Sequence, residues 1–431
     1  MLKRKIYDDL LQWKSKKRKK VLVLTGARQV GKTFIIEKFA EENYNNSIII
    51  NFEKQPQFKQ VFTGDLSPDN IISQLTLLLP EKNIIPNETV LIFDEIQSCP
   101  QAITSLKFFA EDENYDVIAT GSLLGISYKE VSSFPVGSTD RMTLHSLDFE
   151  EFLWANGVGS SHIDIIRKHF TDITTVPEAF HTKFLQLFRE YMVVGGMPAA
   201  VQEYISSKNF LKVLKIQRDI VSDYSDDIIK YAEGPEKTKA RACLLSIPKH
   251  LARGYKKFRY SIVDKNGNSK KYAGSLMWLY DAGIINFCNN LSRIELPLEG
   301  NAVEDAFKVY MSDTGLLVSM LEDGSQADII NGNLGIYKGA VYENVIGDIF
   351  AKSGKRLYYY EYRSQIEMDF IIRYEDKTTA IEVKSADHTK SKSMNAIIKN
   401  YKTQQGIKLS TKNVGYVDKV KTLPLYMAMF L

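Results

Sequence analysis

Residues 26–33 constrain the fold of this chain more than any other stretch. Their sequence, GARQVGKT, fits the pattern G-x-x-x-x-G-K-[ST] without a mismatch. An apolar run rich in β-branched residues precedes it at 21–25, and a segment with helical spacing follows at 34–40. A strand, a glycine-containing loop and a helix in this order are the context in which the pattern binds phosphate. Glycines let the backbone wrap closely, and amides at a helix N-terminus point toward an anion. The sequence therefore predicts a nucleotide site.

Each residue of this loop has an expected role. Lys32 supplies a cation to the β- and γ-phosphates of ATP, and Thr33 supplies a hydroxyl ligand to Mg²⁺. The nucleotide-binding residues are expected to be Gly26, Ala27, Arg28, Gln29, Val30, Gly31, Lys32, Thr33 and Phe34. The alternative interpretation is a chance match in a glycine turn.

Four further apolar runs, at 47–53, 89–95, 115–122 and 141–147, predict the other strands of a parallel sheet. The carboxyl ends of such strands meet at the ligand-binding edge. Asp94 is expected to hold Mg²⁺ through its water shell, and Glu95 to accept a proton from the attacking water. Thr120 or Ser122 would sense the γ-phosphate, with a strand-end cap as the alternative. These residues predict Mg²⁺-dependent ATP hydrolysis.

The net charge of +4 is unevenly distributed. Residues 1–20 carry nine Lys and Arg against two Asp, and residues 336–431 carry sixteen against ten Asp and Glu. Basic ends favour contact with DNA or RNA, above all through the C-terminal domain, whereas solvated lysines are the alternative for 14–20. Three scattered cysteines, no signal peptide and no membrane-spanning run predict a cytoplasmic protein that does not associate with a membrane.

A second group of chemical side chains lies near the end of the chain. Asp369, followed by Glu382 and Lys384, fits the nuclease pattern D-x(n)-[DE]-x-K. Glu382 and Lys384 are two apart on an expected strand and share one face. Asp369 lies on an expected neighbouring strand, 367–372, and Glu343 on the preceding helix. Three converging carboxylates require a cation, so Glu343, Asp369 and Glu382 are candidate ligands of a second Mg²⁺ or Mn²⁺. Lys384 would orient water or stabilise charge on a scissile phosphate. The pattern also arises by chance.

Several motifs together resemble a prokaryotic family of AAA-type P-loop ATPases. The motifs lie at 26–33, 91–97, 119–122, 144–152 and 195–198. The resemblance implies an ATPase domain followed by a C-terminal domain of uncharacterised function with a restriction-endonuclease-like fold. It also supports nuclease-like roles for Glu343, Asp369, Glu382 and Lys384. The family usually has Gly-Arg before the fifth strand, whereas here Gly137 and Arg141 are separated, which leaves the role of Arg141 open. Oligomers are common among AAA-type proteins, so an oligomer is one expectation.

The expected fold is α/β in five segments. They are a basic N-terminal segment (1–20), a P-loop ATPase domain with helices on both sheet faces (21–150), a helical region (151–235), a winged-helix-like connector (236–335) and a restriction-endonuclease-like domain (336–431). The expected function is a Mg²⁺-dependent ATPase, with Lys32 and Glu95 as catalytic residues, coupled to a nuclease-like domain that acts on nucleic acid through Asp369, Glu382 and Lys384. The alternative is a nucleotide-dependent switch whose nuclease-like domain only binds protein or nucleic acid.

Overall fold

The computed structural model describes residues 2–16, 20–121, 137–231, 236–252, 256–333, 338–362, 365–384, 392–400 and 405–431. Ser122, a candidate γ-phosphate sensor, lies outside them. The chain forms two compact units. One is Arg4–Ser146, and the other is Leu147–Leu431 together with the first three residues.

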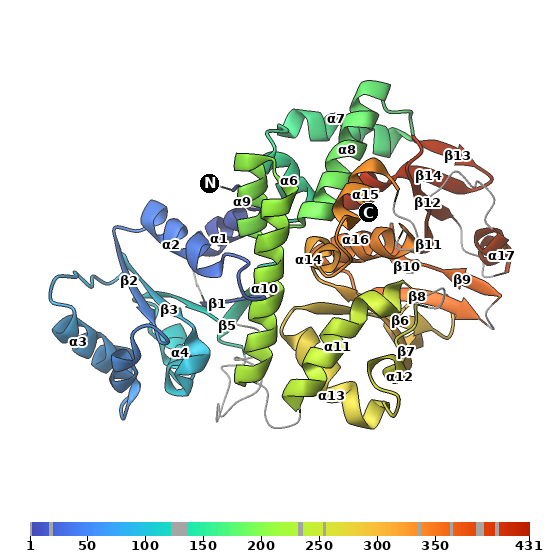
Figure 1. Ribbon diagram of the computed structural model, residues 1–431. Helices are drawn as coiled ribbons and strands as arrows, with labels where there is room; N and C mark the ends of the chain where they lie inside the picture. Colours follow the sequence, from blue (N-terminus) through green and yellow to red (C-terminus); the bar gives the residue numbers. More distant parts are fainter. Residues whose placement is uncertain are drawn as a thin grey trace. The chain divides into compact units, whose positions relative to one another are not determined.

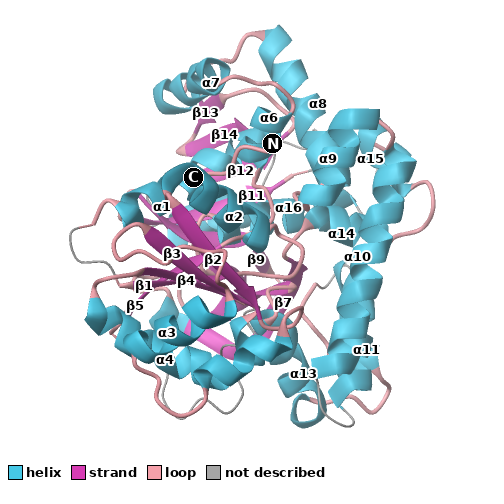
Figure 2. Ribbon diagram, turned by 90° about the vertical axis from the view of Figure 1, so that its left-hand side faces the viewer, coloured by secondary structure: helices cyan, strands magenta, loops and turns pink. Residues whose placement is uncertain are grey.

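The first unit is built on a parallel sheet of order β2-β3-β4-β1-β5. Helices α1 and α2 lie on one face and α3 and α4 on the other (Figure 2). This confirms the predicted parallel sheet with helices on both faces. The elements are α1 (Ile6–Lys14), β1 (Val21–Thr25), α2 (Lys32–Asn43), β2 (Asn46–Asn51), α3 (Pro68–Leu78), β3 (Thr89–Asp94), α4 (Pro100–Asp112), β4 (Asp116–Thr120) and β5 (Thr139–Thr143), with short 3₁₀ helices at Pro56–Phe62 and Ile96–Ser98.

Alternate residues of the strands form the core of this unit. Val21 and Val23 of β1, and the equivalent positions of β2, β3 and β4, pack in one cluster with α3 and α4. The intervening residues, such as Leu22 and Leu24, point to the other face and are also buried. Burial on both faces explains why these strands are continuous apolar runs in the sequence.

The basic N-terminal segment is partly built into this unit. Helix α1 buries Ile6, Leu10 and Trp13, and the Trp13 indole donates to the Lys20 carbonyl over 2.9 Å. The acidic Asp8 and Asp9 occupy its first turn, and Lys14 its last, which suits the helix dipole. The basic N-terminal segment predicted from the charge pattern therefore contains a packed helix.

The second unit begins with helices and ends with two sheets (Figure 1). Its helices are α6 (Phe149–Ala155), α7 (Ser160–Asp172), α8 (Glu178–Val194), α9 (Pro198–Ser207), α10 (Phe210–Tyr231), α11 (Glu236–Leu251), α12 (Tyr260–Val263), α13 (Ser269–Asp281), α14 (Thr314–Ser319), α15 (Ser325–Asn331), α16 (Lys338–Lys352) and α17 (Lys392–Asn400). Its strands are β6 (Ile285–Leu291), β7 (Ala302–Met311), β8 (Leu357–Tyr362), β9 (Ile366–Met368), β10 (Phe370–Tyr374), β11 (Lys377–Val383), β12 (Gly406–Ser410), β13 (Gly415–Val417) and β14 (Val420–Pro424), with 3₁₀ helices at Glu299–Asn301 and Leu425–Phe430.

The two sheets of this unit have the orders β7-β6-β8-β9 and β10-β11-β12-β14-β13. Strand β6 pairs with β8 in parallel. The sheet β7-β6-β8-β9 therefore includes strands from both sides of residue 335, the expected boundary between the connector and the C-terminal domain. The single strand expected at 367–372 is instead two strands, β9 and β10, which belong to different sheets. Asp369 lies between them. Among the described residues, no helix combines the length and the apolar character needed to cross a membrane.

Candidate functional site

The phosphate loop follows the end of β1 and enters the N-terminus of α2. Gly31, with φ of 94°, caps this helix in the left-handed conformation, which glycine adopts without strain. A Cβ atom on Gly26 would lie 2.2 Å from the Leu144 carbonyl oxygen, so the loop requires glycine there as well. Val30 is buried, and Phe34 is 59% exposed. The loop is therefore held by backbone contacts that only small residues allow.

Lys32 lies folded against its own loop. Its ammonium donates to the Gly26 carbonyl over 3.0 Å and to the Ala27 carbonyl over 2.8 Å. Burial lowers the pKa of Lys32, and the neighbouring Glu95 and Asp94 oppose that shift. A buried ammonium gains most from a fully charged acceptor, and the phosphates of ATP are such acceptors.

The Asp94 carboxylate is the centre of a hydrogen-bond network at the end of β3. It accepts from the Thr33 hydroxyl over 3.0 Å, from the Asn51 side-chain amide over 2.8 Å, and from the Thr120 hydroxyl. Asp94 is 1% exposed, and three donors are what a buried carboxylate needs. The Thr33 hydroxyl and the Asp94 carboxylate are adjacent hard oxygen donors, so they fit the Mg²⁺ that accompanies ATP. Thr120, a predicted γ-phosphate sensor, donates its hydroxyl hydrogen bond to Asp94. A role of Thr120 in sensing the γ-phosphate would therefore act through Asp94.

Glu95 follows Asp94 in a left-handed backbone conformation, with φ of 52°. Non-glycine residues adopt it at a cost of about 1–3 kcal/mol, and such residues cluster at functional sites. The Gln97 side-chain amide donates to the Glu95 carboxylate over 2.5 Å. This contact holds the expected catalytic base in one orientation.

Two residues of this site were not predicted. Asn51, at the end of β2, binds Asp94; a polar residue ending a buried strand is a signal that could have revealed it. Arg4 is 8% exposed and donates to the Val30 carbonyl over 3.2 Å and to the His145 carbonyl over 2.6 Å. It joins the phosphate loop to the segment after β5. No sequence pattern indicates a loop contact from a residue so far upstream.

Comparison with family models matches residues 18–153 to the AAA domain. Residues 18–153 are an AAA domain. It is a P-loop ATPase domain, for which ATP is the ligand. Residues 185–327 and 338–427 match two domains of unknown function, DUF8612 and DUF4143. No curated protein matches the sequence.

Solved structures give matches of low identity. A Walker-type ATPase of Pyrococcus abyssi is 14% identical, with 74% of this chain and 96% of that chain covered and a TM-score of 0.44. The ORC1 protein of Aeropyrum pernix in complex with DNA is 13% identical, with 76% and 92% covered and a TM-score of 0.30. DnaA from Aquifex aeolicus, bound to AMPPCP, is 12% identical, with 64% and 86% covered and a TM-score of 0.28.

Outside the AAA domain, a buried charge cluster surrounds Glu343 of α16. Lys308 of β7, 1% exposed, lies 3.6 Å from the Glu343 carboxylate, and Lys256 binds the other oxygen of Glu343. The Tyr310 hydroxyl donates to Glu343 over 3.1 Å. Burial alone would raise the pKa of Glu343, but Lys308 and Lys256 lower it to about 2. Neither lysine was among the predicted site residues, and nothing in the sequence pattern pairs them with Glu343.

The other predicted nuclease-like residues lie near this cluster. Asp369 accepts from the Val383 amide over 2.7 Å, and burial, followed by the Glu343 charge, raises the pKa of Asp369 to about 8. Lys384 lies 2.8 Å from Glu382, whose Oε2 is buried and has no hydrogen-bond partner among the described residues.

Two of the three predicted carboxylate ligands have polar partners of their own. Lys308 and Lys256 contact Glu343, and the Val383 amide donates to one oxygen of Asp369. In the described part of the chain, no group of three or more His, Cys, Asp or Glu side chains is placed to hold a metal ion. The three-carboxylate metal site therefore stays a prediction, and in this structure Lys308 and Lys256 supply positive charge beside Glu343.

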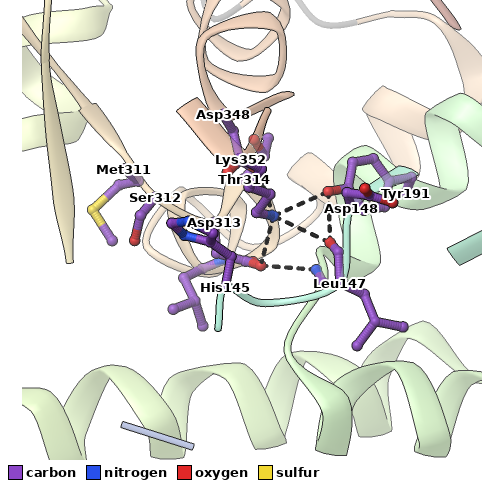
Figure 3. A network of polar contacts seen from close by, with 12 residues as sticks. His145, Leu147, Asp148, Tyr191, Met311, Ser312, Asp313, Thr314, Asp348 and Lys352 are labelled. Atoms are coloured by element: carbon purple, nitrogen blue, oxygen red, sulfur yellow. Dashed lines mark hydrogen bonds and ion pairs between the residues drawn. The ribbon is translucent and has the colours of Figure 1, made fainter. Parts of the chain in front are cut away.

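A second buried network lies at the other end of α16 (Figure 3). The Lys352 ammonium donates to the Asp348 carboxylate over 2.9 Å, to the Tyr191 hydroxyl over 3.1 Å and to the Leu147 carbonyl over 3.2 Å. The Asp313 carboxylate lies 3.9 Å away. Leu147 is the residue at which the second unit begins. This network therefore holds the entry of the chain into that unit.

The glycine pair Gly195–Gly196 makes room for this network. A Cβ atom on Gly195 would lie 2.1 Å from the Asp313 carboxylate, and one on Gly196 would lie 2.0 Å from the Leu147 carbonyl. The Gly196 amide donates to Asp313 over 2.8 Å, and the Leu147 amide donates to the Gly196 carbonyl over 2.7 Å. The two glycines of the motif at 195–198 are thus needed for this close packing.

Proposed function

We propose that this chain is a nucleotide-dependent switch, in which ATP binding and hydrolysis by the AAA domain control a C-terminal nuclease-like domain that binds its partner without cutting it. The observation that carries the proposal is the buried ion pair between Lys308 and Glu343. Lys308, at 1% exposure, supplies positive charge beside Glu343, one of the residues predicted to bind a metal ion.

Helix α16 is the element through which the switch would act. It carries Glu343 in its first half and Lys352 at its last residue, so the two buried networks share one rigid body. Asn344, next to Glu343, donates to the Thr314 hydroxyl over 2.9 Å and accepts from the Met311 amide over 2.8 Å, which fixes α16 on the end of β7. A displacement of Leu147 would shift Lys352, which binds its carbonyl. Because Lys352 and Glu343 lie on the same helix, α16, the shift would also reach Glu343.

The proposed ATPase chemistry uses the AAA domain's own side chains. Lys32 and the backbone of residues 26–34 would bind the phosphates, and Thr33 and Asp94 would hold Mg²⁺. Mg²⁺ would neutralise charge on the phosphates. Glu95, held by Gln97, would accept the proton of the attacking water. Thr120 would act through Asp94.

The experiment that tests the switch compares ATP turnover and nuclease activity in the same preparation. Full-length protein is incubated with Mg²⁺ or Mn²⁺ and single- or double-stranded DNA and RNA, and a titration measures divalent-ion binding. The proposal expects ATP turnover that Lys32→Ala removes, no cleavage, and no divalent affinity that depends on Asp369 or Glu382. Cleavage that Asp369→Ala abolishes would overturn it.

That contrary outcome would favour the second candidate, an ATP-controlled Mg²⁺- or Mn²⁺-dependent nuclease. One observation supports this candidate. The buried Oε2 atom of Glu382, which has no hydrogen-bond partner in the described part of the chain, is a polar group that a ligand would satisfy, and Lys384 lies beside it.

A further inference from the structure

The region from α11 to β6 has a charge that the whole-chain composition hides. Residues 236–291 contain eleven Lys and Arg against three Asp and Glu, a net charge of +8 in a chain whose total is +4. The rest of the chain therefore has a net charge of −4. A local excess of this size indicates a polyanionic partner for this region.

The fold of this region presents one helix to solvent. Helices α11, α12 and α13 lie beside β6 and β7 (Figure 1). The turn between α12 and α13 is tight, because a Cβ atom on Gly267 would lie 2.2 Å from the Tyr260 carbonyl. Asn268 caps α13 by accepting from the Lys271 amide over 3.0 Å. The α12–α13 turn is therefore a fixed structural element.

Helix α13 packs with one face and leaves the other open. It buries Tyr272, Ser275, Leu276 and Leu279. Its exposed positions are Ser269, Lys270, Lys271, Ala273, Gly274, Met277 and Tyr280. Among the described residues, only the Glu236 carboxylate, at 4.0 Å, lies within 4 Å of a Cβ atom on Gly274. The exposed face of α13 thus has small residues, Ala273 and Gly274, in its middle. Lys270 and Lys271 precede them, and Met277 and Tyr280 follow.

From these observations we infer that α13 and the turn before it form an interface for duplex DNA. The major groove of B-form DNA is about 12 Å wide and admits a helix, whereas the major groove of A-form RNA is deep and too narrow. The exposed Lys265 and Lys270 lie on either side of the α13 N-terminus and would contact backbone phosphates. Met277 and Tyr280, 45% and 46% exposed, would lie on the groove side.

This placement differs from the sequence-based expectation, which assigned nucleic-acid contact to the basic ends of the chain, above all to residues 336–431. The inference deepens the proposed switch by naming its partner, and it depends on that proposal only for the link to ATP. Binding of DNA in the absence of nucleotide is a separate measurement, so each idea fails independently.

The test measures fluorescence anisotropy of a labelled duplex of about 30 base pairs with the full-length chain, over a range of salt concentrations. We expect Lys265→Ala/Lys270→Ala to weaken binding at least tenfold and to lower the salt slope by about two. Lys168→Ala/Lys183→Ala, which removes two exposed lysines from α7 and α8, is the matched control and should bind as the parent does. Met277→Glu should weaken binding through charge on the exposed face, with basal ATP turnover unchanged as evidence of folding.

Three results would overturn the inference. One is the absence of duplex binding at about 50 mM salt, where phosphate contacts are strongest. Another is an equal loss of binding in the control variant, which would assign the effect to total charge. The third is equal affinity for duplex RNA or for anionic lipid vesicles with the same dependence on Lys265 and Lys270.

Discussion

The hydroxyl of Thr33 donates to the carboxylate of Asp94 over 3.0 Å, which joins the first turn of α2 to the end of β3. The two residues are 61 positions apart in sequence, and both were expected to serve the same Mg²⁺. Their hydrogen bond places the two oxygen donors side by side, which is the geometry that a shared ion requires.

Replacement of Lys32 tests the nucleotide site itself. Lys32→Ala removes the cation that faces the phosphates, and we expect ATP binding to fall below detection in a titration with a fluorescent ATP analogue. Lys32→Arg keeps the charge but changes its geometry, and we expect intermediate binding. ATP turnover retained by Lys32→Ala would contradict the assignment.

Asn51→Ala tests the contact that the sequence did not reveal. The substitution leaves Asp94 with one donor fewer, and a hydrogen bond to a charged group contributes about 1.5–3 kcal/mol. We expect Mg²⁺-dependent ATP turnover to fall about tenfold or more. Asn45→Ala, on an exposed asparagine that contacts Glu88 near the start of β2, is the control and should leave turnover unchanged. An equal effect of both variants would remove Asn51 from the site.

Arg4→Met tests whether the N-terminal arginine supports the phosphate loop. It removes a buried contact to the Val30 carbonyl and a partly buried contact to the His145 carbonyl. We expect weaker ATP binding and a free energy of unfolding lowered by about 2 kcal/mol, measured by urea denaturation. The exposed Lys5 gives the control Lys5→Met. Unchanged ATP affinity in a folded Arg4→Met protein would show that the arginine acts on stability alone.

Lys308→Met tests the neutralised carboxylate cluster. Breaking a buried ion pair from one side costs about 3–5 kcal/mol, because the remaining charge is left uncompensated. We expect that loss in urea denaturation. Combining Lys308→Met with Glu343→Gln should recover part of it, since the double substitution removes both charges. Stability losses that simply add would show that the pair is not coupled.

Asp348 makes stability depend on pH. Burial raises the pKa of Asp348 to about 7 from an ordinary 3.8, with Lys352 opposing the shift and Asp313 adding to it. Between about pH 4 and pH 7, Asp348 therefore keeps its proton in the folded state and has lost it in the unfolded chain. The free energy of unfolding should decrease as pH rises from about 4 to about 7, and this group should add no further change above that.

The same group gives a control for that pH dependence. The shift corresponds to at most about 4 kcal/mol, since each unit is worth about 1.4 kcal/mol. Asp348→Asn should flatten this part of the stability profile, measured by denaturation at a series of pH values. An unchanged slope in that variant would assign the dependence to another group.

The sequence by itself determined the parts of this protein whose signals are local. Residues 26–33 predict their loop because the glycines, the lysine and the flanking strand and helix are contiguous. The position of Asp94 and Glu95 could be predicted because a carboxylate pair at the end of an apolar strand lies at the ligand-binding edge of a parallel sheet. The positions of the five strands along the chain followed from their apolar runs, and the AAA-type domain from a resemblance of several motifs.

Only the tertiary structure decided which distant residues meet. Arg4 reaches Val30, Asn51 reaches Asp94, and Lys308 reaches Glu343 through packing that no spacing rule encodes. Asp369 was expected within one strand and instead lies where the chain passes from one sheet to another. The charge of a buried cluster depends on every side chain that enters it, so a pattern of three carboxylates could not reveal the two lysines that neutralise it.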